Sequence, residues 1–348
     1  MVSMMKYQVA EIKNSGIQIL THCGLSASDA TICMDCLLAA DMRGVNSHGI
    51  MHLKDICDRI EYGSINVKAE IVTRQTADST LVIDANHSLG MVSAMKAMEQ
   101  CVEIAKKTGI AFATICNSNT YGYGAFYSMY AAERKMIGFS ACNTKAYVAP
   151  IGGSVPKLGT NPLTIAIPSG KYPDFVLDMA TSQVAVNKIA LALKNGKPIP
   201  DYWAVGPDGE KTTDPEVAYQ GALLPFGGYK GYGIQLAISL IAYALAGGDL
   251  DRDIPKAWVD VEKKCNFGCI IGAIDISKFV NPEAFCNKVD DLLEWVKTGH
   301  ATSSTSEILI PGERAYQNYL ESKKNGIEVT ERVYEELNQL MERYHIQG

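Results

Sequence analysis

A serine and a histidine that could move a proton stand side by side at Ser47 and His48, in the segment RGVNSHG of residues 43–49. The apolar spacing after them predicts a helix from about Ser47 to Gly63, with His48 in its first turn. The positive end of the helix dipole should lower the pKa of His48 by less than about one unit. Such an imidazole is mostly neutral at neutral pH and can serve as a general acid or base. The alternative is a capping serine beside a surface histidine.

Metal binding is possible in two places but poorly supported in both. His52 lies one turn after His48, which is the spacing of a metal pair, yet no glutamate lies between them and no third ligand is obvious. Cys33 and Cys36 have a metal or redox spacing, but they fall in the middle of a predicted helix and no second pair follows. We therefore predict no metal and expect all ten cysteines to be structural.

The glycine patterns do not match a known nucleotide fingerprint. Gly122 and Gly124 follow a predicted strand and open a helix, but Tyr127 occupies the third glycine position and no acidic residue ends a following strand. The dense run from Gly227 to Gly233 fits neither that fingerprint nor a phosphate loop. If a dinucleotide binds, it binds without the Rossmann signature.

Five loop segments rich in Gly, Pro and small polar residues stand at strand ends or helix starts. There, free backbone N–H groups can hold anions, although any one segment could be a simple turn. They cover residues 117–122, 149–153, 158–162, 178–182 and 310–314.

The elements that must position these residues begin with a helical stretch of about 65 residues, with helices at 5–23, from Ser26 to about Gly44 and from Ser47 to Gly63. Strands and helices are mixed after it, so the class is α/β or α+β. Residues 247–256 are the best candidate for a mobile surface loop. Strands are predicted at 70–84 (two), 110–116, 136–142, 163–167, 175–179 and 267–275, and helices at 90–107, 123–135, 182–194, 230–246, 283–297, 313–323 and 329–344.

The composition is that of an ordinary globular chain of 348 residues, 47% hydrophobic and 20% charged. The net charge of −6 gives no basic face for nucleic acid. No apolar run is long enough for a membrane span, and the N-terminus turns polar too early for a signal peptide. We therefore expect a cytoplasmic protein.

Read together, the motifs resemble one family, the second type of malate/L-lactate dehydrogenase, from about residue 5 to 345. This family includes ureidoglycolate dehydrogenase, diketogulonate reductase, sulfolactate dehydrogenase and the piperideine- and pyrroline-2-carboxylate reductases. The strings that carry the resemblance are RGVNSHGI (43–50), GTNPLTIAIP (159–168), VLDMATSQVA (176–185), PIPDYWAVGPDGEKTTDPEVA (198–218), GALLPFGGYKGYG (221–233) and ILIPGER (308–314).

The resemblance implies a non-Rossmann fold in which a largely antiparallel sheet domain, residues 71–299, holds NAD or NADP. A helical domain formed by both chain ends, residues 1–70 with 300–348, would complete the site and the dimer. The family also implies a homodimer and a small-molecule substrate.

The resemblance also implies residue roles. His48 would protonate the substrate as hydride arrives, assisted by Ser47, with Lys188 as a further catalytic residue and Thr160 as a substrate contact. The cofactor would lie against Thr120, Tyr121, Gly122, Tyr123, Gly124, Thr144, Asp178, Met179, Ala180, Tyr229, Lys230, Pro311, Gly312, Glu313 and Arg314.

Four residues, in three places, depart from the family pattern. His52 replaces an arginine that usually grips the substrate carboxylate, and imidazole lacks both its fixed charge and its fork. Thr120 and Tyr121 replace a His-Phe pair, so Thr120 cannot titrate. Lys145 lies in a loop that is often proline-rich, and we hypothesise that it supplies part of the missing positive charge to the substrate.

The leading hypothesis is an oxidoreductase that moves hydride between NAD(P) and C2 of a 2-oxo or 2-hydroxy acid. Reduction of a cyclic ketimine carboxylate is the alternative in the same chemistry, although Lys188 favours a keto substrate because ketimine reductases tend to have an acidic residue there. A third reading, motivated by His52 and Thr120, is a cofactor-binding relative without turnover.

Overall fold

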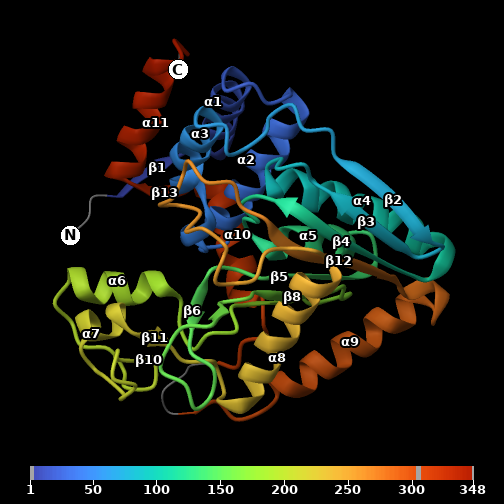
Figure 1. The fold of residues 1–348 in the computed structure, drawn as a ribbon. Coiled ribbons are helices and arrows are strands. Elements are labelled where there is room, and N and C mark those ends of the chain that lie inside the picture. The colour runs from blue at the N-terminus through green and yellow to red at the C-terminus, as the bar shows by residue number, and fades with distance from the viewer. Residues whose placement is uncertain (1–3, 303–306, 347–348) are drawn as a thin grey trace.

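A seven-stranded sheet forms the centre of the computed structural model, which describes residues 4–302 and 307–346 (Figure 1). Its strand order is β2-β3-β4-β12-β5-β8-β9, with β3 and β4 parallel and the other neighbours antiparallel. The largely antiparallel order confirms the expected class and differs from a Rossmann sheet. The strands are β2 Val72–Ala77, β3 Thr80–Asp84, β4 Ile110–Ser118, β5 Met136–Cys142, β8 Leu163–Ile167, β9 Phe175–Met179 and β12 Phe267–Asp275.

Helices cover both faces of this sheet. Alternate residues of β4, such as Ala111 and Ala113, are buried in a core shared with α4 Gly90–Thr108 and α5 Gly124–Ala132. The opposite face carries α8 Tyr229–Leu240 and the π-helical turn η3 Ile241–Leu245, which packs on β12 (Figure 1). A 3₁₀ turn, η4 Ile276–Lys278, precedes α9 Pro282–Lys297.

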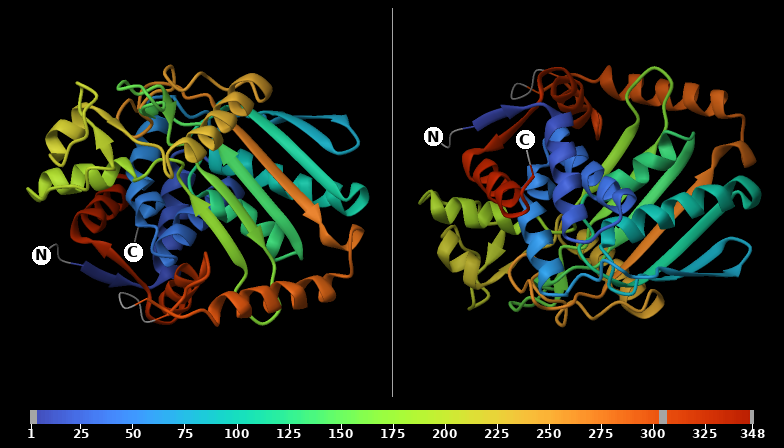
Figure 2. Two further views of the ribbon diagram at one scale, coloured as in Figure 1. Left: turned by 90° about the horizontal axis from the view of Figure 1, so that it is seen from below. Right: turned by 90° about the horizontal axis from the view of Figure 1, so that it is seen from above.

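The two chain ends meet in a helical part of the molecule beside the sheet (Figure 2). Strand β1 Met4–Tyr7 pairs antiparallel with β13 Ile327–Thr330, so the helix predicted from residue 5 starts later, at Val9. Local spacing could not reveal this pairing because its partner lies about 320 residues away. The helices are α1 Val9–His22, α2 Ala27–Met42, α3 Leu53–Glu61, α10 Glu313–Asn325 and α11 Glu331–Arg343.

A smaller four-stranded sheet with the order β10-β11-β6-β7 was not expected from the sequence. Its strands are very short, so they lack the alternation that predicts a strand. The small sheet lies beside two helices and consists of β6 Ala146–Val148, β7 Leu158–Gly159, β10 Ala204–Val205 and β11 Ala222–Leu223, with α6 Val186–Lys194 and α7 Pro215–Gln220.

Two predicted segments need correction. The helix expected from Ser47 begins only at Leu53, after two 3₁₀ turns, η1 Asn46–His48 and η2 Ile50–His52. Residues 247–256 have no helix or strand, as a loop would, but they are anchored: Asp251 and Ile254 are buried. A buried carboxylate in this loop holds other loops together, as described below.

Candidate active site

The Ser47–His48 pair lies in the first of the two 3₁₀ turns between α2 and α3. The Ser47 hydroxyl oxygen is 3.0 Å from His48 Nδ1, which fixes the ring and leaves Nε2 as the nitrogen that can meet a ligand. The helix dipole expected at His48 is absent, because a single 3₁₀ turn has no row of aligned peptide dipoles behind the residue.

The surroundings of His48 lower its pKa much further than a dipole would. Solvent reaches the ring, yet protein atoms surround most of it, and this desolvation, with a smaller contribution from His52, lowers the pKa from 6.5 to about 4. His48 is therefore neutral at neutral pH. It can accept a proton from an alcohol, or donate one after binding it.

Asp41, in the last turn of α2, holds residues Gly49 and Ile50, which follow the Ser47–His48 pair. Its carboxylate accepts a hydrogen bond from the Ile50 backbone N–H at 2.7 Å and lies directly against Gly49, where an added Cβ would be 2.0 Å from its oxygen. Burial raises the pKa of Asp41 to about 7, opposed by the Ile50 hydrogen bond and by the charge of His52. Sequence reasoning missed Asp41, whose only signal is an acidic side chain on a buried helix face.

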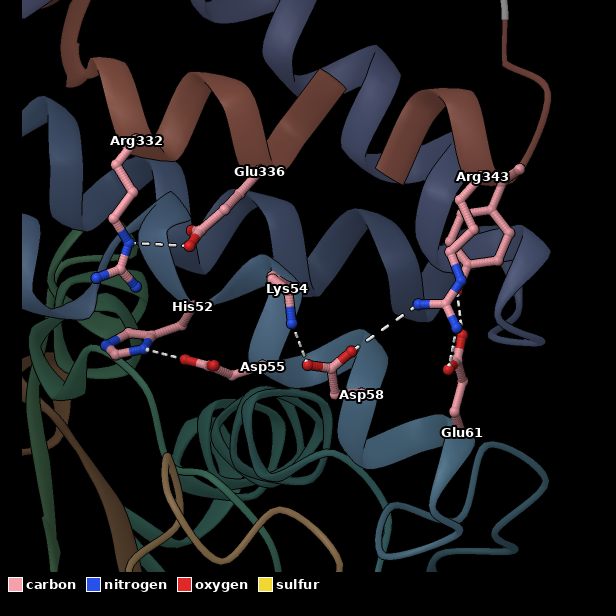
Figure 3. A network of polar contacts seen from close by, with 9 residues as sticks. His52, Lys54, Asp55, Asp58, Glu61, Arg332, Glu336 and Arg343 are labelled. Carbon is pink, nitrogen blue, oxygen red and sulfur yellow. Dashed lines mark hydrogen bonds and ion pairs between the residues drawn. The ribbon is translucent and has the colours of Figure 1, made fainter. Parts of the chain in front are cut away.

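His52 is buried, and both of its ring nitrogens have partners, of which Figure 3 shows Asp55. Its Nε2 lies 2.8 Å from the Ser47 carbonyl, its Nδ1 lies 3.2 Å from Asp55, and its ring stacks on Trp258 with centroids 3.9 Å apart. Neither nitrogen is left for a substrate carboxylate in this arrangement. Trp258 was not singled out from the sequence.

The predicted cofactor segment from Thr120 to Gly124 joins β4 to α5. Thr120 and Tyr121 are buried, and Thr120 Oγ1 has no hydrogen-bond partner among the described residues. Gly122 has a φ of +73°, and an added Cβ would lie 2.9 Å from Met91, so only glycine fits there. Gly124 opens α5 and lies against Thr164 of β8.

The end of β9 brings a second predicted segment to the same place. Asp178 pairs in register with Thr164. Solvent reaches its side chain, yet the protein atoms around the carboxyl group desolvate it and raise its pKa to about 7. Its charge also acts on Tyr123, as does that of Arg43 from the RGVNSHG segment. Asp178, Met179 and Ala180 therefore lie next to the Thr120–Gly124 segment.

The C-terminal segment 311–314 also contacts β9, next to the Asp178–Ala180 segment. The Val176 N–H of β9 donates to the Pro311 carbonyl at 3.0 Å, and Gly312, with a φ of +92°, packs on Val176. Further along α10, the Asn318 amide donates to the Arg43 carbonyl at 3.3 Å. The helix thus links the 311–314 segment to the start of the RGVNSHG segment.

Glu313 performs a structural task within that segment. Its carboxylate accepts from Lys297 Nζ at 2.7 Å and from the Ile310 N–H at 2.9 Å. These contacts lower the pKa of Glu313 against the opposing effect of burial. A cofactor contact here would come from the backbone of the helix start or from Arg314, which is exposed.

Thr144, predicted to contact the cofactor, and Thr160, predicted to contact the substrate, lie side by side. Their hydroxyls are 3.2 Å apart, and the Thr160 carbonyl accepts from the Thr181 N–H at 2.8 Å, immediately after Ala180. Asp251 fixes this group: its carboxylate accepts from the Gly159 N–H at 2.7 Å and from Ser239 Oγ at 2.6 Å.

Four predicted side chains lie at the surface or have other partners. Lys145 Nζ donates to the Arg252 carbonyl at 2.7 Å, and Lys188 is exposed on α6. Tyr229 and Lys230 are exposed in the first turn of α8. No contact of these four with His48 is described within residues 4–302 and 307–346.

The site fits a dinucleotide in the chemistry of its groups. Helix α5 contacts β9, and α10 begins beside it, just after the Pro311 carbonyl that accepts from Val176 of β9. In the two first turns the Phe126 and Glu313 N–H groups already donate to the Tyr123 and Ile310 carbonyls, so a phosphate would be held by the remaining N–H groups of these turns. The unpartnered Thr120 hydroxyl and the Asp178 carboxyl add polar groups for a ribose or an amide. Gly227 and Gly228, at the start of α8, have open space where a Cβ would stand.

Across the described ranges, no three His, Cys, Asp or Glu side chains gather as metal ligands would. Cys33 and Cys36 are fully buried in the core, which fits packing residues. In the same ranges no helix is both long and apolar enough to cross a bilayer.

Comparisons with known proteins match almost the whole chain to one family. A family model described as malate/L-lactate dehydrogenase matches residues 7–338. The malate/(S)-sulfolactate dehydrogenase of Methanothermus fervidus is 37% identical over 331 residues, which cover 95% of this chain and 96% of the relative.

Solved structures agree over almost the whole chain. Sulfolactate dehydrogenase from Methanocaldococcus jannaschii matches with a TM-score of 0.93 at 36% identity, covering 99% of this chain and 98% of that chain. Malate dehydrogenase from Entamoeba histolytica matches with a TM-score of 0.94 at 27% identity, covering 99% of each chain. Fold and sequence thus define a dehydrogenase. The chain belongs to the malate/L-lactate dehydrogenase family.

Proposed function

We propose that this protein transfers hydride between a nicotinamide dinucleotide, NAD or NADP, and C2 of a 2-oxo or 2-hydroxy acid, with His48 as proton donor and acceptor. The observation that carries the proposal is the 3.0 Å contact between Ser47 Oγ and His48 Nδ1, which occupies Nδ1 and leaves Nε2 as the ring nitrogen for a substrate. A proton donor is needed because the carbonyl oxygen gains negative charge during reduction.

The roles of the chain's own residues follow from their positions. When bound, the reduced cofactor supplies the hydride; α5 and α10 would hold its phosphates at their N-termini, and Asp178 a ribose or amide group. Ser47 keeps His48 oriented, and Asp41 keeps the turn in place through Ile50. Thr160 and Thr144 offer neighbouring hydroxyls to the substrate and cofactor.

The substrate class is supported by the relatives, whose names include malate and sulfolactate dehydrogenases. These substrates are 2-hydroxy acids with a second anionic group, so the site should present positive charge. We retain Lys145 as a candidate for that charge, although a ligand must share or displace its bond to the Arg252 carbonyl. An unchanged KM of the Lys145→Ala variant for an acidic substrate would remove it from the site.

We further propose that the protein is a homodimer and that residues 1–70 and 300–348 form one domain against 71–299. An apolar surface on α8 and η3 supports the dimer, because Leu240 and Leu245 are 57% and 70% exposed there. Light scattering on a sizing column should give twice the chain mass, and Leu240→Glu with Leu245→Glu should give one chain mass. A monomeric wild type would contradict this.

The function is tested by a panel of oxaloacetate, pyruvate, sulfopyruvate and a cyclic ketimine carboxylate, each with NADH and with NADPH, followed by the absorbance of the reduced cofactor. We expect turnover of at least one 2-oxo acid. Turnover of the ketimine alone would establish the alternative chemistry. Binding of cofactor, seen by fluorescence, without turnover of any substrate would indicate a silent relative.

A further inference from the structure

Both ring nitrogens of His52 face oxygen atoms that act as acceptors. Nε2 lies 2.8 Å from the Ser47 backbone carbonyl and Nδ1 lies 3.2 Å from a carboxylate oxygen of Asp55. A neutral imidazole has one N–H, so it would satisfy one oxygen and turn a lone pair toward the other. Because the residue is only 5% exposed, water does not readily replace the missing bond. The imidazolium form satisfies both oxygens.

An aromatic ring and a pinned loop hold His52 in this position. The Trp258 ring stacks on it with an interplanar angle of 12°, and the face of an indole attracts a cation. The loop that carries Trp258 is held by Arg59, which is fully buried and donates to the carbonyls of Ala257 and Lys263 at 2.9 Å each. The ring of His52 therefore packs against a fixed surface.

Charged groups on three helices surround His52. Asp55 on α3 is in direct contact with its ring, and Asp41 on α2, with a pKa of about 7, is only partly ionised at pH 7 and adds less negative charge. The cations of the network are Lys54, which is paired with Asp58, and Arg332 on α11, which is paired with Glu336 (Figure 3). His48, neutral at neutral pH, adds no opposing charge.

We propose that His52 is a doubly protonated positioning residue, whose imidazolium holds the Ser47 carbonyl through Nε2 while Asp55 balances its charge at Nδ1. The bond to Ser47 fixes the residue whose hydroxyl orients His48. The cation also disfavours a second charge on His48.

This inference deepens the proposed function and rests on it for its catalytic meaning, but its first test needs no turnover. In protein labelled with ¹⁵N-histidine, long-range ¹H–¹⁵N spectra report whether each ring nitrogen carries a proton. We expect both nitrogens of His52 to be protonated at pH 7 and His48 to be neutral, with His52→Gln giving the assignment. One unprotonated nitrogen on His52 at pH 7 overturns the proposal, whether or not the enzyme turns over.

Two variants test the link to His48. His52→Gln removes the charge, so the break in the pH profile of kcat/KM for the 2-oxo acid should move up by about one pH unit, with kcat about tenfold lower and cofactor KM unchanged. Asp55→Asn keeps an acceptor but loses the balancing charge, so His52 should lose its second proton at a lower pH in the spectra. His22→Gln, an exposed histidine, is the matched control. A lower kcat with an unmoved break would show a purely structural role and contradict the proposal.

Discussion

The depressed pKa of His48 predicts an unusual pH dependence for reduction. With a pKa of about 4, about one ring in a thousand is protonated at pH 7, whereas about a quarter would be at an ordinary pKa near 6.5. The proton donor form is therefore scarce over the whole neutral range. The kcat/KM of the 2-oxo acid should fall about tenfold per pH unit from about pH 5 to about pH 9, without a plateau.

Oxidation should behave in the opposite way. The neutral ring is the base that takes the alcohol proton, so kcat/KM of the 2-hydroxy acid should be flat over the same range. The assay is steady-state turnover at saturating cofactor, in buffers of constant ionic strength, with His48→Gln and the control His22→Gln measured alongside. A reduction profile that is flat below about pH 6 and breaks near about 6.5 would refute the depressed pKa. A tenfold slope that persists in His48→Gln would refute the role of His48.

Three further predictions concern the surroundings of the site. Arg59→Leu leaves three carbonyl oxygens without a donor and should lower the free energy of unfolding, measured by urea titration, by about 3 kcal/mol or more. The control Arg134→Leu, at an exposed position, should change it by less than about 0.5 kcal/mol. The pKa of Asp41 is about 7 in the folded protein and 3.8 in its ordinary state, so the free energy of unfolding should fall by up to about 4 kcal/mol as pH rises between these values. Asp41→Asn should remove this pH dependence, and a variant with the same pH dependence would contradict the raised pKa of Asp41. Gly49→Ala places a methyl group against the Asp41 carboxylate and should lower kcat about tenfold or more, with cofactor affinity retained. The control Gly233→Ala has open space at its Cβ and should not change kcat. Equal kcat values for the two variants would contradict the proposed role of Asp41 in holding the Ser47–His48 turn.

Periodicity predicted most of the elements because each carries its own signal. Strand β4 alternates buried and half-buried residues, and Ser26 caps α2 by accepting a hydrogen bond from the Asp29 N–H at 3.1 Å, as its spacing indicated. Pairings between distant segments carry no such signal. The strand Met4–Tyr7 exists because residues 327–330 supply its hydrogen bonds.

The segments that form the candidate site could be predicted from the sequence, but the pKa values of their side chains could not. The motifs identified Ser47, His48 and the loops that the fold gathers around β9. The pKa of His48 depends on the protein atoms around it, and these come from parts of the chain that no local pattern links. Asp251 was unpredictable for the same reason: the sequence predicts a mobile loop there, but the side chain is buried and accepts hydrogen bonds from Gly159 and Ser239, which are distant in the chain. The stacking of Trp258 on His52 was unpredictable for this reason too.

Single-turnover oxidation of the reduced cofactor by a 2-oxo acid tests the central claim most directly, because product release does not contribute to its rate. Wild-type protein and His48→Gln are each mixed with bound cofactor and the best substrate of the panel at neutral pH. We predict that the variant binds cofactor with unchanged affinity and reacts about a hundredfold or more slowly, as expected for loss of a proton donor. A rate within a few fold of the wild type, at equal cofactor occupancy, would contradict proton transfer by His48.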